Sequence, residues 1–328
     1  MKVKLILVAL FGTVALGAMA EEVSLCVVVK DDLGLPVSNA MVSVSTQKRL
    51  ALGYGSRPDH FEWTSNVTDS AGVAILEFRC LTADFSCYVD SPEHYKEKNL
   101  QGRFAAVESS TFGMDFLSAK TNMQFKMYRK INPIPMFSYP GFDAPKLPGP
   151  CGIWGYDLKL GDWVKPYGKG EVSDFKLEYN LRASETEYAS WGRIIFEDSK
   201  SGFYVRKMND TQIMKSEYMA DTNAVFASTK EFRYSAIRGM DKNAMWQNNA
   251  TWHKLVEEDE YLVMRTRVKL DNEGNVVSAN YSKMYGPVVF KKRFGFRQIT
   301  FNPNVNDPNL ESDPEENLNR NSRGLGLP

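Results

Sequence analysis

An all-β fold is predicted by three features of this sequence. Short apolar runs, several of which alternate with polar residues, are bounded by Gly, Pro, Asp and Ser in the manner of strands and turns. Long stretches with helical periodicity are absent from residues 21–130. In residues 23–44, VSLCVVVKDDLGLPVSNAMVSV, an apolar run stops at a polar turn and resumes after Pro36. Residues 68–76, TDSAGVAIL, place the turn 69–72 directly before an alternating strand.

The composition leaves room for two domains and gives the chain no net charge. A chain of 328 residues and 37.1 kDa is long enough for two hydrophobic cores. Lys and Arg together number 40, as do Asp and Glu, so no strong field draws the chain to nucleic acid or to an anionic membrane. We therefore expect neither of these partners.

Residues 1–20 have the features of a signal peptide. Lys2 and Lys4 give a positive start, residues 5–16 form an apolar core too short to span a bilayer comfortably, and residues 18–20, AMA, match the small-x-small pattern that a signal peptidase cleaves. No later stretch is apolar enough for a transmembrane span. We expect an exported protein located in the periplasm, at the cell surface or outside the cell, with its mature chain starting at Glu21.

Residues 21–130 are predicted to form one domain of strands. The segment from 47 to 66 is polar with scattered aromatic residues and is interpreted as a long loop or an irregular strand pair. The candidate strands are 23–30, 40–46, 72–79, 85–89 and 123–129.

Within this domain, residues 23–95 resemble a known family. Residues 31–40, DDLGLPVSNA, with Val42 and Val44, then residues 68–74, TDSAGVA, and the turn at 91–95, SPEHY, are similar to the carboxypeptidase regulatory-like domain. The resemblance implies a transthyretin-like or Ig-like β-sandwich. Since most members of that family are accessory modules without catalytic residues, it also implies a binding or structural role. The two-part layout of the whole chain resembles that of exported bacterial proteins.

Export changes the interpretation of the cysteines. An even number of cysteines, in a chain bound for an oxidising compartment, makes one or two disulfides an expectation. Cys80 and Cys87 flank a short segment that could form a hairpin, so we favour a bond between them, although the other pairings stay open. No metal site is expected, because His60, His94 and His253 are far apart in the sequence. The four cysteines are Cys26, Cys80, Cys87 and Cys151.

Residues 131–150 are predicted to be a proline-rich linker. Six prolines within this stretch, INPIPMFSYPGFDAPKLPGP, disfavour regular ladders and favour extended segments. The aromatic residues of the stretch indicate that it packs on a neighbouring domain.

A second β-rich domain is predicted over residues 151–301. Residues 175–182 alternate as a half-buried strand does. We expect one hairpin between 192–198 and 202–207, and another between 261–270 and 275–284 with Gly274 in its turn. These elements predict an antiparallel sheet or sandwich.

Residues 302–328 are predicted to form a polar tail. The segment has few apolar residues and many Asn, Asp, Pro and Glu, so it cannot bury enough surface to order itself by hydrophobic packing. We expect it to lie extended along the surface or to be disordered.

A search for catalytic motifs finds no candidate catalytic residue. The sequence contains no G-x-S-x-G elbow and no phosphate-binding glycine loop in the required context, and we expect neither a catalytic site nor a cofactor. Paired carboxylates of a glycoside hydrolase leave no sequence signature, because their separation is a property of the fold. A glycan-active enzyme that uses such carboxylates in the second domain is therefore the alternative hypothesis.

Aromatic residues provide the only candidate binding site. Tryptophan and tyrosine rings are the surfaces on which sugar rings stack, and several lie in or near glycine-flanked turns of the second domain, where side chains can project. A core position is the competing interpretation for each tryptophan. The sequence thus predicts a non-catalytic exported binding or structural component, whose partner is a polysaccharide or another surface protein. The candidate ligand-binding residues are Trp154, Trp163, Tyr167 and Trp191.

Overall fold

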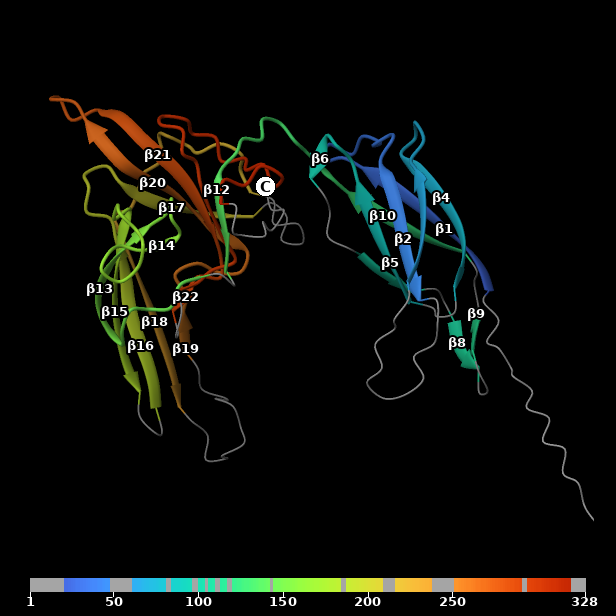
Figure 1. The fold of residues 1–328 in the computed structure, drawn as a ribbon, viewed down its shortest axis with the longest axis horizontal. Coiled ribbons are helices and arrows are strands. Elements are labelled where there is room, and N and C mark those ends of the chain that lie inside the picture. The colour runs from blue at the N-terminus through green and yellow to red at the C-terminus, as the bar shows by residue number, and fades with distance from the viewer. Residues whose placement is uncertain are drawn as a thin grey trace, which may run out of the picture. The chain divides into compact units, whose positions relative to one another are not determined.

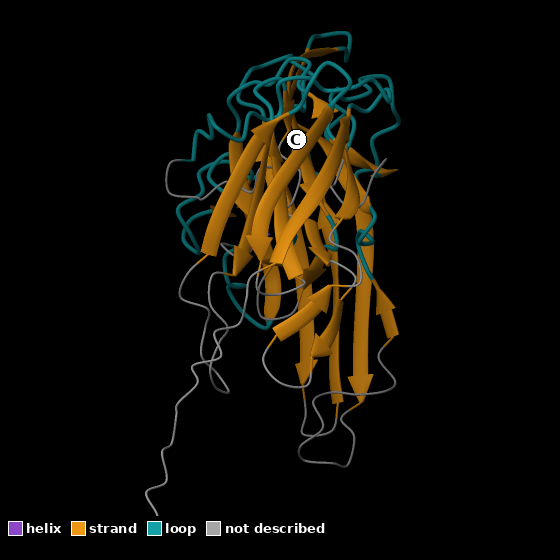
Figure 2. Cartoon of the chain, turned by 90° about the vertical axis from the view of Figure 1, so that its right-hand side faces the viewer, coloured by secondary structure: helices purple, strands orange, loops and turns teal. Residues whose placement is uncertain are grey.

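The computed structural model confirms the all-β fold class. It describes residues 21–47, 61–80, 84–95, 100–103, 106–109, 113–116, 120–141, 144–183, 187–208, 216–237, 251–290 and 294–319. No α-helix occurs among these residues, and the elements are strands joined by loops (Figure 2). The expected signal peptide lies outside the described residues. The chain divides into two compact units, Met1–Arg129 and Lys130–Pro328.

The first unit is built on two sheets whose strand orders are β10-β1-β4 and β3-β2-β5-β7 (Figure 1). Its central strand β1 runs antiparallel to β4 and parallel to β10. The strands of the unit are β1 (Glu21–Lys30), β2 (Met41–Gln47), β3 (Phe61–Val67), β4 (Val73–Cys80), β5 (Asp84–Asp90), β6 (His94–Tyr95), β7 (Leu100–Arg103), β8 (Ala106–Ser109), β9 (Gly113–Phe116), β10 (Lys120–Lys126) and β11 (Tyr128–Arg129).

Alternation along the strands forms the core of this unit. Val23, Leu25, Val27 and Val29 of β1 are buried, whereas the residues between them are half-buried. Alternate residues of β2, β4 and β5 point into the same apolar cluster. A one-residue slip of any of these strands would turn its apolar side chains to water, so the core fixes the register.

The turn motifs quoted above are stabilised by side-chain hydrogen bonds to the backbone. The carboxylate of Asp31 accepts from the amides of Leu33 and Leu35, and that of Asp69 accepts from the amides of Ala71 and Val73. Gly72 has a φ of 71°, and a Cβ there would meet the Val29 carbonyl oxygen at 2.5 Å, so only glycine fits this turn.

The predicted bond between Cys80 and Cys87 is not formed in the structure. All four cysteines belong to the described residues, and each is a thiol. Cys80 lies on β4 and Cys87 on β5, which belong to different sheets and contribute to one buried cluster. The hairpin that would place them opposite each other is absent because β5 pairs with β2 and β7 instead.

The second unit is also built on two main sheets, with strand orders β14-β13-β15-β16-β18-β19 and β12-β24-β21-β20-β17 (Figure 1). Its strands are β12 (Phe137–Pro140), β13 (Cys151–Asp157), β14 (Asp162–Trp163), β15 (Phe175–Ala183), β16 (Glu187–Ile195), β17 (Gly202–Lys207), β18 (Thr229–Ile237), β19 (Thr251–His253), β20 (Glu260–Leu270), β21 (Val276–Tyr285), β22 (Val289–Phe290), β23 (Phe294–Gly295) and β24 (Gln298–Phe301).

One predicted hairpin of this unit is confirmed and the other is wrong. β20 and β21 pair across a turn in which Gly274 has a φ of 82°. β16 and β17, in contrast, do not pair with each other: β16 joins β15 and β18 in the six-stranded sheet, and β17 joins β20 in the other. The polar turn 198–201 therefore carries the chain from one sheet to the other.

Residues 130–150 and the C-terminal segment are integral parts of the second unit. β12 pairs with β24 at the edge of the five-stranded sheet, a position where Pro140 is tolerated. The described tail residues, up to Asn319, follow an extended path as expected, but several of them are buried. The buried tail residues are Asn302, Asn309, Leu310, Glu311 and Ser312.

The carboxylate of Glu311 connects the two segments. It is buried and accepts hydrogen bonds from the Ile131 amide at 2.8 Å and the Asn132 amide at 2.7 Å. In Glu311→Ala these two donors lose their acceptor, which should lower the free energy of unfolding by about 1 to 3 kcal/mol. Urea unfolding measures the change. The exposed Glu316→Ala is the control, and equal stability of the two variants would contradict this role for Glu311.

Candidate functional site

Two of the predicted ligand-binding residues are core residues. Trp154 is 4% exposed and Trp163 is 1% exposed, and their rings meet at a centroid distance of 6.1 Å. Trp154 lies on the same inward face of β13 as Tyr156, which pairs with Trp163. The indole Nε1 of Trp163 donates to the Lys146 carbonyl at 2.7 Å. The flanking glycines do not make these side chains project, and neither ring offers a face to a ligand.

The other two predicted residues are accessible. Tyr167 is 57% exposed and touches Trp154 edge-on, with centroids 6.5 Å apart. Trp191 is half-buried in the middle of β16. The residues beside it, Ser190 and Gly192, lie on the core side, and a Cβ on Gly192 would meet the Phe232 ring at 2.3 Å. Trp191 therefore belongs to the outer face of the six-stranded sheet.

Strand register assembles polar side chains around Trp191. Asn180 of β15 and Arg233 of β18 are its direct partners on either side, and both are exposed. We call this surface the Trp191 face. It consists of Cys151, Ile153, Glu178, Asn180, Trp191, Arg193, Glu231 and Arg233.

The Trp191 face combines the groups that recognise sugars. The next row of side chains across the strands, two residues along from Trp191, contains Arg193, Glu178 and Ile153. In this row the Arg193 Nε donates to the Glu178 carboxylate at 2.6 Å. An indole ring can cover the apolar face of a sugar, while amide, guanidinium and carboxylate groups can hydrogen-bond its hydroxyls. The sequence predicted Trp191, but the polar partners depend on strand register and carry no sequence signature.

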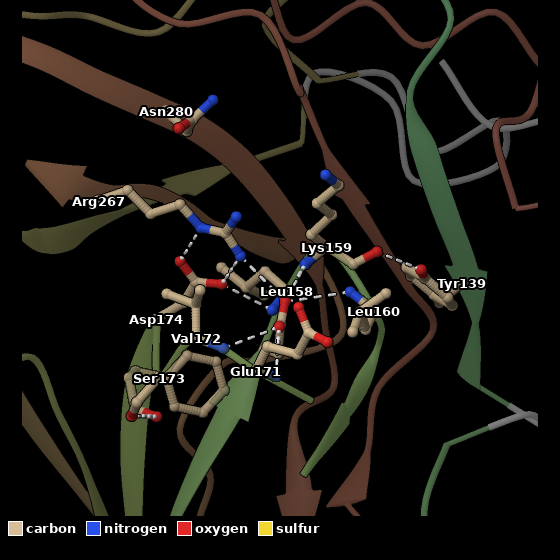
Figure 3. Close-up of polar contacts among 12 residues, drawn as sticks. Tyr139, Leu158, Lys159, Leu160, Glu171, Val172, Ser173, Asp174, Arg267 and Asn280 are labelled. Atoms are coloured by element: carbon tan, nitrogen blue, oxygen red, sulfur yellow. Dashed lines mark hydrogen bonds and ion pairs between the residues drawn. The ribbon is translucent and has the colours of Figure 1, made fainter. Parts of the chain in front are cut away.

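Two buried carboxylates of the second unit meet at one arginine (Figure 3). The Arg267 guanidinium donates through Nε to Asp174 Oδ1 at 2.8 Å, and through Nη2 to Asp174 Oδ2 at 2.9 Å and to Asp157 Oδ1 at 3.0 Å. Asp157 ends β13 and Asp174 stands just before β15, whereas Arg267 comes from β20. This cluster therefore ties the six-stranded sheet to the five-stranded one.

Backbone amides complete the coordination of these carboxylates. Asp174 Oδ2 also accepts from the Leu158 amide at 2.8 Å. Asp157 accepts from four amides, those of Lys159, Leu160, Glu171 and Val172 (Figure 3). Every oxygen of the two carboxylates thus accepts at least one hydrogen bond.

The electrostatics of this cluster are those of a structural site. Burial raises the pKa of Asp174, and the hydrogen bonds and charge of Arg267 pull that pKa back down. Burial opposes the charge of Arg267, but the contacts with Asp174 and Asp157 outweigh it and raise the arginine pKa. A glycoside hydrolase needs a carboxyl group that is open to its substrate, with space for an attacking water or sugar carbon. Asp157 and Asp174 are buried and fully hydrogen-bonded, so they give no support to that chemistry.

The described part of the chain offers few other chemical sites. No group of three or more His, Cys, Asp or Glu residues is placed to hold a metal ion within these residues. The same residues form no helix that is long and apolar enough to cross a lipid bilayer.

Comparison with known proteins finds similarity only among solved structures. No protein-family model and no curated protein sequence matches the chain. A 3-chlorocatechol 1,2-dioxygenase from Rhodococcus opacus 1CP is 13% identical, with a TM-score of 0.25, over 34% of this chain and 62% of that chain.

Two pilins are also similar. The shaft pilin SpaA from Lactobacillus rhamnosus GG is 8% identical, with a TM-score of 0.26, over 56% of this chain and 90% of that chain. The major pilin SpaD from Corynebacterium diphtheriae is 8% identical, with a TM-score of 0.26, over 87% of this chain and 65% of that chain. At these TM-scores the likenesses carry no argument about function. Membership of the carboxypeptidase regulatory-like family stays a prediction.

Removal of Arg267 tests the structural role of the cluster. Arg267→Ala leaves two buried carboxylates without their counter-charge and should lower the free energy of unfolding of the second unit by about 3 to 5 kcal/mol at neutral pH. Arg193→Ala, which removes a half-buried surface ion pair, should cost about 1 kcal/mol or less. Urea titrations of both variants measure the difference.

The loss of folding stability in Arg267→Ala should also depend on pH. The folded-state pKa of Asp174 is raised by burial and should rise further without the arginine. Above the folded-state pKa of Asp174, the variant bears the full free-energy cost of the buried charge. As the pH falls from the folded-state pKa towards the lower pKa of the unfolded state, this cost diminishes, because protonated Asp174 carries no charge. Unfolding at pH 7 and pH 4.5 should show a smaller deficit at the lower pH. A deficit that is constant or grows on acidification would contradict this account.

Proposed function

We propose that this protein is an exported, non-catalytic binding component that takes a polysaccharide on the Trp191 face. The observation that carries the proposal is Trp191 itself, an outward-facing indole at the centre of a sheet, with Asn180 and Arg233 directly beside it. Export is supported by residues 1–20, whose charged start, apolar core and AMA site are those of a signal peptide.

A binding role fits the chemistry of the second unit better than catalysis does. The buried carboxylates Asp157 and Asp174 are occupied by Arg267 and by backbone amides. The charged groups of the Trp191 face are exposed or half-exposed and lie on an open sheet surface. Such a surface can hold a chain of sugars by stacking and hydrogen bonds without a deep cleft.

Binding of the chain from Glu21 onward to a panel of soluble polysaccharides tests the proposal. For the polysaccharide that binds, Trp191→Ala should weaken the affinity about tenfold or more, because the stacking surface is lost. Isothermal titration measures the affinity. The same titration of Tyr167→Ala measures the contribution of the other accessible residue predicted from the sequence. Val305→Ala, which removes an exposed side chain elsewhere in the unit, is the control.

The titrations distinguish a glycan-binding component from a protein-binding or structural one. A saturable interaction that is lost in Trp191→Ala and kept in Val305→Ala supports a glycan-binding component. Absence of binding to the whole panel, or affinity unchanged by Trp191→Ala, would reject the Trp191 face as a glycan site and leave a protein-binding or structural role.

A further inference from the structure

The first unit contains a second accessible aromatic surface, on the outer face of its four-stranded sheet. Trp63 of β3 and Tyr88 of β5 lie on either side of β2, with ring centroids 5.3 Å apart and planes inclined by 38°. Trp63 is 57% exposed and Tyr88 is half-buried. Neither residue belongs to the set predicted from the sequence.

The core fixes the direction in which these side chains point. Val42 and Val44 of β2, and Phe85, Cys87 and Val89 of β5, are buried in the first unit's core. The alternate residues of the same strands must point to the other side of the sheet. Register then aligns Trp63 with Ser45 and Ser86 in one row, and Ser65 with Ser43 and Tyr88 in the next.

Serine hydroxyls surround the two rings. The Oγ atoms of Ser43 and Ser65 are hydrogen-bonded at 2.8 Å. Ser45 is buried at the centre of the sheet, between the strands that carry the two rings. We call this surface the Trp63 platform. It consists of Ser43, Ser45, Trp63, Ser65, Ser86 and Tyr88.

The platform is uncharged. On β3, β2 and β5 its two rows contain only aromatic and serine residues, and Gln101 of β7 continues the row of Ser86. The next row towards one end of the strands adds Met41 and Val67, with Asp90 on the other side of Met41. At the other end of β5, Asp84 pairs in register with Arg103 of β7, so charged residues begin only beyond the platform at each end. An uncharged surface with aromatic rings and hydroxyls fits a neutral ligand that is apolar on one side and rich in hydroxyls at its edges.

We propose that the Trp63 platform binds a neutral polysaccharide. A sugar ring stacks on the exposed indole, and the hydroxyls of neighbouring sugars hydrogen-bond Ser43, Ser65 and Ser86. The charged groups that characterise the Trp191 face are missing among the described residues of this platform, so the two surfaces differ in the ligands that they favour. The proposal rests on the first unit alone and does not depend on the Trp191 face.

Titration of the chain from Glu21 onward with laminarin, a neutral β-glucan, and with xyloglucan tests this inference. We expect saturable binding to at least one of them that weakens about tenfold or more in Trp63→Ala. Ile75→Ala removes an equally exposed apolar side chain (56%) from the other sheet of the unit and should keep full affinity. Val305→Ala, which removes an exposed side chain of the second unit that belongs to neither surface, should also keep it.

A second variant covers the case in which Trp63→Ala affects folding. Ser65→Arg adds a long charged side chain at an exposed position beside the rings, and should also weaken binding about tenfold while the circular dichroism spectrum stays unchanged. Three outcomes would overturn the proposal. They are no binding of either glucan, binding that both platform variants leave intact, and a concentration-dependent dimer of the wild-type chain that Trp63→Ala abolishes, which would make the platform a protein interface.

Discussion

The second unit depends on one half-buried arginine. Arg267 comes from an irregular part of β20, where the pairing with β21 shifts register and the residue itself has a φ of 54°. That backbone geometry is uncommon for a residue other than glycine, and it occurs where the guanidinium reaches two carboxylates of the other sheet. Withdrawing two carboxylates and part of a guanidinium from water is costly, and hydrogen-bond donors to every carboxylate oxygen offset that cost. The cluster thus makes the relative position of the two sheets specific, which apolar packing alone would leave less defined.

Hydrogen bonds from side chains to the backbone explain the order of the polar segments. In the C-terminal part, the side chains of Asn302, Asp307, Asn309, Asp313 and Asn317 each accept a hydrogen bond from the amide two residues later. Each turn satisfies a backbone amide locally, so the segment needs little apolar burial of its own. Composition reports only how much apolar surface a segment can bury. It therefore predicts an extended or disordered tail and gives no sign of the buried residues of the segment.

Local patterns made most of the first unit predictable, whereas contacts distant in sequence were not. β1, β2, β4 and β5 were expected from alternation and turn residues, and the β20–β21 hairpin from its Gly274 turn. For Trp154 and Trp163 the flanking glycines favour projecting side chains, but both residues are buried, as in the competing core interpretation. Trp63 was missed because its segment is interpreted as a long loop or an irregular strand pair, and neither interpretation shows which side chains project. No spacing rule relates Asp174 to Arg267, since they meet only when the two sheets pack.

Because β12 forms the edge of its sheet, the segment that carries it has to stay in the same gene as the rest of the second unit. A gene rearrangement that cut the chain at Cys151 would remove β12 and leave β24 as the new edge. All four residues of β24 are buried, so the cut would expose a row of unpaired backbone groups together with Ile299 and Phe301. Such an edge invites pairing with other chains. Recombination between related genes should therefore be tolerated near residue 130 and selected against near residue 150, although composition alone marks the whole proline-rich stretch as a spacer.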